Sequence, residues 1–186
     1  MSNEPVNVTL EFTPNPSTLK FVVNRTFCER GAANFTEEQK ATHAPLAKKL
    51  FSVDGVKAVL VGTNFVTITK APDGAWDTIA EKVPQTIEGF IQSGKAAFDE
   101  EWTWETASSN DSDVVTKIKQ VLDQEIRPAV AMDGGDIAFS RYEDGIVYLQ
   151  MQGACSSCPS SVATLKMGVE TRLKEVIPEI QEVVQI

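Results

Sequence analysis

Two cysteines three positions apart, Cys155 and Cys158, are the residues of this chain best suited to chemistry. They stand in the segment GACSSCP (residues 153–159), between a strand-like run and a helical pattern, and Pro159 suits a first helical turn. The start of a helix offers unpaired N–H groups and partial positive charge, which lower the pKa of a cysteine and stabilise its thiolate. Thiolates bind metals and attack disulfides, and the small serines around the pair predict that both sulfurs are approachable.

Four interpretations of this cysteine pair can be weighed first. Structural zinc requires four protein ligands, and only Cys28 and His43 are left, both in the N-terminal part. A dithiol–disulfide oxidoreductase fits a pair at a strand–helix junction, but the surrounding βαβ pattern is absent. Two buried structural cysteines fit poorly with the glycine and serines around them. A plain interaction module could also bind zinc adventitiously through the pair.

An iron–sulfur cluster is usually held by four thiolates, of which one chain supplies two. Two chains related by a twofold axis would supply four, and most homo-oligomers are symmetric dimers. A cluster held between subunits is released when they part, which suits delivery better than permanent electron transfer. The residues therefore favour an iron–sulfur cluster shared between two chains through Cys155 and Cys158. Two pairs of thiolates could hold either a [4Fe–4S] or a [2Fe–2S] cluster, so the residues leave the cluster type open.

The elements that must position the pair lie in residues 112–186. A helical face precedes the turn at residues 133–136, and Pro128 predicts a disturbance near the end of that helix. Strands are predicted at residues 137–142 and 146–151, a helix after the cysteines, and a last strand at 180–186. The order helix, strand, strand, helix, strand predicts one small sheet with helices on one face. The apolar positions of the second helix are Val162, Leu165, Val169, Leu173 and Val176.

The N-terminal part, residues 1–95, reads as a second mixed domain. Alternating or β-branched runs predict strands at residues 6–10, 18–23, 56–61 and 65–69, and helical spacing predicts helices at 44–51 and 76–91. Residues 96–111 form an acidic linker, in which Trp102 and Trp104 either pack back on the first domain or mark a docking site. We therefore expect an α+β protein: two small mixed α/β domains, 1–95 and 112–186, joined by that linker.

Charge and composition exclude several classes of function. The net charge is −9 without a basic cluster, so we expect no nucleic acid and no binding to an anionic membrane surface. An apolar run of about 20 residues, as a membrane span needs, is also missing. The first residues, MSNEP, do not resemble a secretory signal. We expect a cytoplasmic bacterial protein, or one of the mitochondrial matrix if this is a processed mature chain.

Several motifs give the chain a family resemblance. Residues 112–186 resemble the NifU C-terminal (Nfu) domain, through IRP at 126–128, DGGD at 133–136 and above all GACSSCPSS at 153–161. Residues 8–94 are similar to the Nfu N-terminal domain, and the matching segments are TPNP at 13–16, PLA at 45–47 and GTNFVTITK at 62–70. Where the family usually has Ser before the PLA segment, this chain has His43-Ala44.

The resemblance implies an iron–sulfur cluster scaffold or carrier, not an enzyme. Members of the family assemble or carry [4Fe–4S] clusters and pass them to apo-proteins, and the ligand role carries over to Cys155 and Cys158. The implied partners are a second copy through the C-terminal domain, upstream cluster-assembly proteins and apo iron–sulfur proteins. We expect the N-terminal domain to recognise donors or recipients, or to adjust dimerisation.

Other residues that could do chemistry are expected to be structural. Cys28 stands alone and reads as a buried or idle thiol, and His43, the single histidine, as a surface or capping residue. The turn at residues 133–136 is expected to be a backbone device, because paired glycines readily adopt positive φ and the periodic oxygen ligands of a calcium loop are absent. No catalytic residue is predicted.

Overall fold

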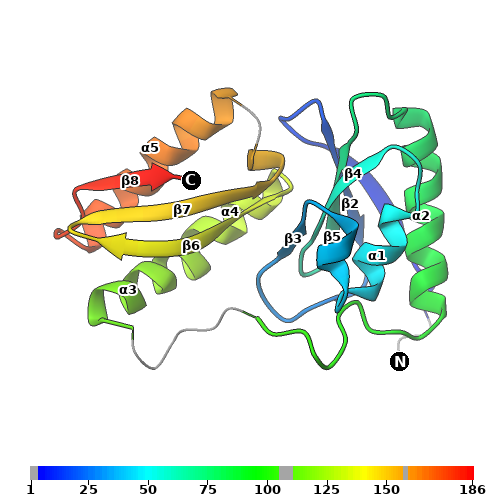
Figure 1. Cartoon of the computed structure of the whole chain (residues 1–186), viewed down its shortest axis with the longest axis horizontal. Helices are drawn as coiled ribbons and strands as arrows, with labels where there is room; N and C mark the ends of the chain where they lie inside the picture. The colour runs from blue at the N-terminus through cyan, green and yellow to red at the C-terminus, as the bar shows by residue number, and fades with distance from the viewer. Residues whose placement is uncertain (1–3, 105–110, 157–158) are drawn as a thin grey trace. The chain divides into compact units, whose positions relative to one another are not determined.

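The computed structural model describes residues 4–104, 111–156 and 159–186, with only the backbone described for 159–164. The chain divides into two compact units between Thr103 and Trp104 (Figure 1). Residues 96–103 of the predicted linker therefore belong to the first unit. Both units combine helices and sheets, as an α+β fold requires.

The first unit is built on a five-stranded antiparallel sheet with the strand order β1-β2-β5-β4-β3. Four of its strands are those that the alternating patterns predict, although the first begins at residue 8 rather than 6. The short third strand was not predicted. The bounds are β1 Val8–Phe12, β2 Thr18–Val23, β3 Ala33–Phe35, β4 Val56–Val61 and β5 Phe65–Lys70.

Two helices pack on this sheet, α1 (Pro45–Phe51) against β4 and α2 (Trp76–Gln92) against β1. Both were predicted, within one residue at each end. A 3-10 turn, η1 (Glu38–Ala41), precedes α1 and was not predicted. The apolar stripe of α2 is buried, as its helical spacing requires, at Ile79, Val83, Ile87 and Phe90.

Trp102 packs back on the first unit, which confirms this prediction for the first of the two tryptophans. Its ring centroid lies 5.5 Å from that of Phe35 on β3 and 5.1 Å from that of Phe98, both in tilted arrangements. Nearby, Ala97 is buried and its carbonyl accepts a hydrogen bond from the Leu46 N–H. The segment after α2 therefore packs on the first unit through Ala97 and Trp102, although most of its other residues are exposed.

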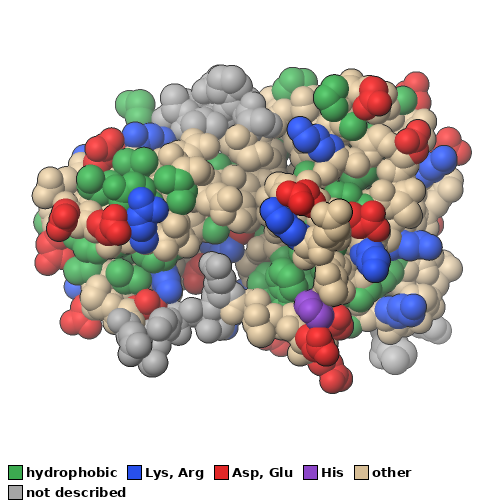
Figure 2. Space-filling view, viewed as in Figure 1, with side chains coloured by type: hydrophobic (Ala, Val, Ile, Leu, Met, Phe, Trp, Pro, Cys, Tyr) green, Lys and Arg blue, Asp and Glu red, His purple; other side chains and the backbone are tan. Residues whose placement is uncertain are grey.

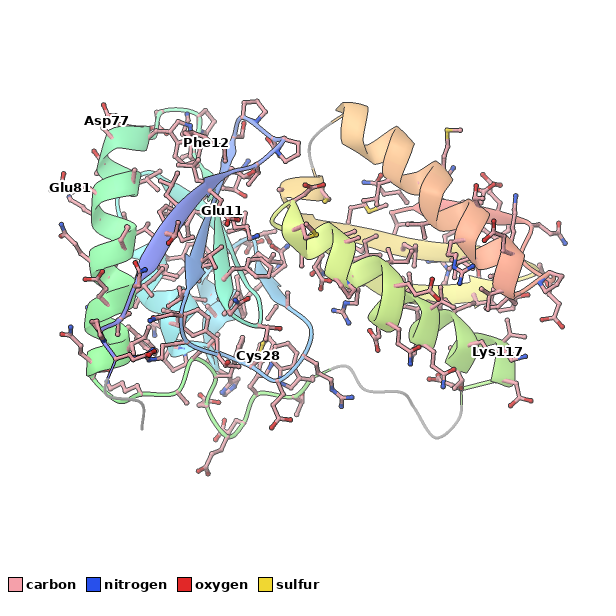
Figure 3. The ribbon with its side chains drawn as sticks, turned by 180° about the vertical axis from the view of Figure 1, so that it is seen from behind. Glu11, Phe12, Cys28, Asp77, Glu81 and Lys117 are labelled. Atoms are coloured by element: carbon pink, nitrogen blue, oxygen red, sulfur yellow. The ribbon has the colours of Figure 1, made fainter. Side chains whose placement is uncertain are left out.

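The second unit has a three-stranded sheet with the order β6-β7-β8, in which β6 and β7 are antiparallel and β7 and β8 are parallel. The helices lie on one face of this sheet, in front of it in Figure 3 and behind it in Figure 1. The predicted order of elements is confirmed. The bounds are α3 Asp113–Val121, α4 Arg127–Met132, β6 Gly135–Glu143, β7 Ile146–Gly153, α5 Pro159–Val176 and β8 Glu182–Gln185.

The helical segment of the second unit runs through Pro128 instead of ending there. A π-helical stretch, Leu122–Ile126, joins α3 to α4, and Pro128 stands in the first turn of α4. A proline ring clashes with the carbonyl four residues earlier in a regular α-helix, and a wider π turn relieves that clash. The disturbance predicted from Pro128 is therefore a local widening of the helix.

The core of the second unit is formed by residues from all its main elements. Ile118, Leu122, Leu149 and Leu173 are almost fully buried in one cluster. Val176, which the helical spacing placed with them, is 40% exposed because it stands at the last residue of α5, where the chain leaves the core.

Charge is spread over both units. Figure 2 shows acidic and basic side chains interspersed on the visible face, without a continuous basic area. In the described segments, every helix is too short or too polar to cross a membrane.

Candidate thiolate site

Cys155 lies where the second strand of the second unit ends. It stands in the 3-10 turn η3 (Ala154–Ser156), directly after β7. Its side chain is only 5% exposed and joins the hydrophobic core cluster of the unit. The expectation that both sulfurs are approachable is therefore wrong for Cys155. The reason is that its side chain packs against Gly135, the first residue of β6.

Gly135 makes the space that Cys155 occupies. A Cβ atom placed on Gly135 would lie 2.3 Å from the Sγ of Cys155 and 3.1 Å from its Cβ. Both distances are shorter than ordinary van der Waals contact, so only glycine admits the thiol at this position. Gly134, its neighbour, has a φ of 76°, which confirms the prediction of a backbone device for one of the two glycines.

Backbone hydrogen bonds hold the cysteine turn against the start of β6. Gly135 pairs with Gly153 in the β6–β7 ladder, and the Ala154 N–H donates to the Gly134 carbonyl at 3.1 Å. The Ser156 hydroxyl donates to the Gly153 carbonyl at 2.8 Å. The two motifs that the sequence shows far apart, residues 133–136 and 153–156, thus form one structural unit around Cys155.

Arg127 and Asp136 clamp α4 to β6 beside this turn. The Arg127 Nε donates to Oδ1 of Asp136 at 2.8 Å and its Nη2 donates to Oδ2 at 2.6 Å. Asp136 is 3% exposed, so its charge requires this partner. The hydrogen bonds to Asp136 raise the pKa of Arg127 above its ordinary value. Sequence reasoning missed this pair, although an arginine before Pro128 and the last acid of DGGD were the available signals.

Cys158 lies outside the described residues, so its position relative to Cys155 stays a prediction. The helix α5 does begin at Pro159, as predicted. Within the described segments, His, Cys, Asp and Glu do not gather in any group of three or more that could hold a metal ion. The cluster ligands proposed from the sequence therefore rest on the motif and on the placement of Cys155.

The other two candidate ligands belong to the first unit. Cys28 is buried, as predicted, and its thiol donates to the Gly31 carbonyl at 3.7 Å. His43 is partly exposed, and its Nδ1 lies 3.2 Å from Oδ2 of Asp99 and 3.4 Å from Oε2 of Glu101. It is a surface residue, as expected, and the helix α1 has no side-chain cap.

Each of the two units matches a protein-family model. A model described as "NifU-like domain" matches residues 118–184, and one described as "Scaffold protein Nfu/NifU N terminal" matches residues 8–94. The fold, with a cysteine turn between β7 and α5 of one α+β unit and a second α+β unit before it, is of the NifU-like class. The chain belongs to the Nfu/NifU family.

Two relatives with more than 40% identity agree with this assignment. The chain is 42% identical over 176 residues to the human "NFU1 iron-sulfur cluster scaffold homolog, mitochondrial", covering 94% of this chain and 69% of that protein. It is 43% identical over 179 residues to "NifU-like protein 4, mitochondrial" of Arabidopsis thaliana, covering 93% of this chain and 63% of that protein. A solution structure of a NifU-like protein from Saccharomyces cerevisiae is 21% identical, with a TM-score of 0.48 over 54% of this chain and 92% of that one.

Proposed function

We propose that the chain is a scaffold or carrier for iron–sulfur clusters, with Cys155 and Cys158 as the cluster ligands. The observation that carries the proposal is the placement of Cys155 by Gly135 at the end of β7, inside the unit that matches the NifU-like domain. The names of the human and plant relatives support it, since the human protein is called an iron–sulfur cluster scaffold. The chain spans 69% and 63% of those two relatives.

The proposed cargo is a [4Fe–4S] cluster that two copies of the C-terminal unit share. Each copy supplies two thiolates, so two copies supply the four that such a cluster requires. A [2Fe–2S] cluster needs the same four thiolates and is the alternative. Because Cys155 is 5% exposed, its side chain must turn outward from Gly135 to reach a cluster between subunits. Loading is therefore coupled to a rearrangement of the η3 turn.

Transfer proceeds by ligand exchange. Thiolates of a recipient apo-protein replace Cys155 and Cys158 one at a time, while the iron and sulfide of the cluster move as a unit. Each released cysteine can take up a proton, and its side chain can return to the core. No small-molecule substrate is turned over, so we do not propose an enzyme. The partners are apo iron–sulfur proteins and the proteins that build the cluster.

The names of the relatives support one of the two expected cellular locations of this protein. The names of the human and Arabidopsis proteins place those proteins in mitochondria. This agrees with the mitochondrial matrix, one of the two locations expected from the sequence. The cytoplasmic alternative has no support from the comparisons.

The competing function is that of a dithiol–disulfide oxidoreductase. In such a protein one thiol must be accessible in order to attack a disulfide, because thiolate exchange depends on access as well as on pKa. Burial of Cys155 restricts this role in the same way as it restricts cluster loading, because in both cases the side chain must first turn outward. The placement of the motif after a strand and before a helix is the feature that keeps the alternative worth testing.

Anaerobic reconstitution with iron and sulfide tests the proposal. The wild-type chain should bind about two irons per chain, half of a shared [4Fe–4S] cluster, and show the broad visible absorption of such clusters. Cys155→Ala and Cys158→Ala should each abolish the absorption, while Cys28→Ala, a change in the other unit, should leave it intact. No bound iron in the wild-type chain, together with catalysed reduction of a disulfide substrate, would replace the carrier by the oxidoreductase.

A further inference from the structure

One of the two proposed ligand cysteines is held in a closed pocket of the second unit. Cys155 is 5% exposed and belongs to the buried cluster that forms the core of this unit. Its Sγ lies 2.3 Å from the place of a Cβ atom at Gly135, and that Cβ would also lie 3.1 Å from the Gln152 carbonyl oxygen. The thiol therefore fills a space between β6 and β7 that has no room for a side chain at position 135.

The turn that carries Cys155 is tied to the strands on both sides of this residue. Before it, the Ala154 N–H donates a hydrogen bond to the Gly134 carbonyl at 3.1 Å. After it, the Ser156 hydroxyl donates to the Gly153 carbonyl at 2.8 Å. While these hydrogen bonds persist, the backbone of the turn has little freedom to carry the thiol toward the surface.

A buried ion pair fixes the strand that supplies Gly135. The Arg127 guanidinium donates two hydrogen bonds to Asp136, at 2.8 and 2.6 Å, and so joins α4 to the second residue of β6. Asp136 is 3% exposed, and loss of one partner from a buried pair is strongly destabilising. The start of β6 is therefore firmly positioned, and the pocket at Gly135 exists before a metal or a partner binds.

Access to the sulfur decides whether the pair can be oxidised. A thiolate attacks one sulfur of a small disulfide, forms a mixed disulfide and releases the other sulfur as a thiolate. The second cysteine then displaces the group that remains, so two protein thiols become one disulfide and one small disulfide becomes two thiols. Whichever cysteine attacks first, Cys155 must take part in one of the two steps. An internal disulfide therefore cannot form while its sulfur stays in the pocket.

We infer that the pocket at Gly135 protects the ligand pair from oxidation by small disulfides, such as oxidised glutathione, while the chain is cluster-free. The Cys155 sulfur becomes available only in a minor open conformation, in which its side chain has turned out of the pocket. Iron binds thiolates and not disulfides, so this protection preserves the capacity to load a cluster. The inference rests on the proposed function, because a pair of cluster ligands is what the pocket would preserve.

Single-cysteine variants of the full, cluster-free chain test the protection. The change Cys28→Ser with Cys158→Ser leaves the thiol of Cys155 alone. The matched control replaces all three cysteines by serine and adds Ser156→Cys, which puts the thiol on the next residue of the same turn, an exposed position. Each chain is treated with a neutral aromatic disulfide, and the released thiol is followed by its absorbance.

Cys155 should react about ten- to a thousandfold more slowly than the Ser156→Cys thiol, because minor conformations are commonly populated at about 0.1–10%. In urea, where the pocket is lost, the two thiols should react at similar rates. Similar rates in the two folded chains would overturn the proposal.

Gly135→Ala makes the opposite change in the chain that keeps only Cys155. The added methyl group displaces the thiol, so Cys155 should react at least about tenfold faster. Gly168→Ala, whose Cβ would meet nothing within 4 Å, should leave the rate unchanged. Equal acceleration by both changes would contradict a specific role of the pocket. If Gly135→Ala does not fold, the comparison of Cys155 with the Ser156→Cys thiol remains decisive, since it involves no change at Gly135.

The Cys28→Ser chain, which retains the ligand pair, gives a second readout with oxidised glutathione. Intact mass should show the internal disulfide forming at least about tenfold more slowly than in the same chain with Gly135→Ala. Equally fast formation in both chains would sink the proposal. None of these measurements contains iron. Rapid reaction of Cys155 would therefore remove the protection alone, whereas a protected chain that binds no cluster on reconstitution would remove the proposed function.

Discussion

The Sγ of Cys155 occupies the place where any residue other than glycine would put a Cβ atom at position 135, only 2.3 Å away. Two motifs that are separate in the sequence therefore depend on each other: the glycine pair of DGGD and the first cysteine of the CxxC. This contact holds the proposed ligand in the core of the unit, so the proposed cluster binding requires the Cys155 side chain to turn outward.

Gly135→Ala should disturb the cysteine turn. The added methyl group overlaps the thiol, so the turn or β6 must shift, at a cost of about 1–3 kcal/mol as for other overpacked cores. We expect lower stability in urea and a change in the rate of cluster loading, followed by visible absorption.

Gly168→Ala is the matched control for that variant. Gly168 lies in α5, and a Cβ there would meet nothing within 4 Å. Alanine in an exposed helical position is favoured over glycine by up to about 1 kcal/mol, so this variant should be unchanged or slightly more stable. Equal destabilisation by both changes would contradict a specific role for Gly135.

Asp136→Asn should destabilise the second unit by about 3 kcal/mol, because Arg127 then loses the charged partner of a largely buried pair. Asp123→Asn breaks the other ion pair of Arg127, in which Asp123 is 55% exposed, and should cost at most about 0.5 kcal/mol. Urea unfolding, followed by amide signals of β6 and β7, measures both. A loss for Asp123→Asn as large as that for Asp136→Asn would show that Asp136 has no special role.

Trp102→Ala should destabilise the first unit by roughly 2 kcal/mol, since it removes the ring that packs on Phe35 and Phe98. Phe12→Ala removes an aromatic ring that is 88% exposed and should change stability by less than about 0.5 kcal/mol. Thermal unfolding compares the two variants with the wild type. Tolerance of Trp102→Ala would mean that residues 96–103 act as a linker after all.

The stability of the last strand, β8, should depend on pH through Glu170. Its carboxylate accepts hydrogen bonds from Lys174 at 2.6 Å and from the Val183 N–H at 3.0 Å, and these bonds lower the pKa of Glu170 below 4.5. The folded state thus binds the proton more weakly than the unfolded state. Its contribution to stability is present above pH 4.5 and disappears as the pH falls through the lowered pKa.

The Val183 amide reports this titration directly. Its chemical shift should move with a midpoint below pH 4.5, and Glu170→Gln should remove the movement. Loss of the hydrogen bond should also speed amide exchange at Val183 at neutral pH, by an amount equivalent to about 1 kcal/mol. A midpoint above 4.5 would contradict the assigned hydrogen bonds.

The elements that sequence could predict are those with a strong local pattern. The stripe of α2 at Ile79, Val83 and Ile87 and the β-branched runs of β4 and β5 carry their period in adjacent residues. The three-residue strand β3 is too short to show a period. The π-helical stretch Leu122–Ile126 was missed because it accommodates Pro128, and a proline in the sequence predicts the end of a helix rather than a widened turn.

The candidate site was predicted in its residue types but not in its packing. The cysteine motif and the family resemblance pointed to Cys155, whereas its burial depends on a contact with Gly135 across two strands. The Arg127–Asp136 clamp likewise joins a helix to a strand and has no local signature.

Native mass measurement of the anaerobically reconstituted chain tests the central claim most directly. Cluster and dimer should appear together, with one [4Fe–4S] cluster for two chains, and the cluster-free chain should return when recipient thiolates remove the cluster. Cys155→Ala should yield neither the cluster nor the cluster-dependent dimer. A cluster bound to a single chain, or retained by Cys155→Ala, would contradict the claim that two copies share it through this cysteine.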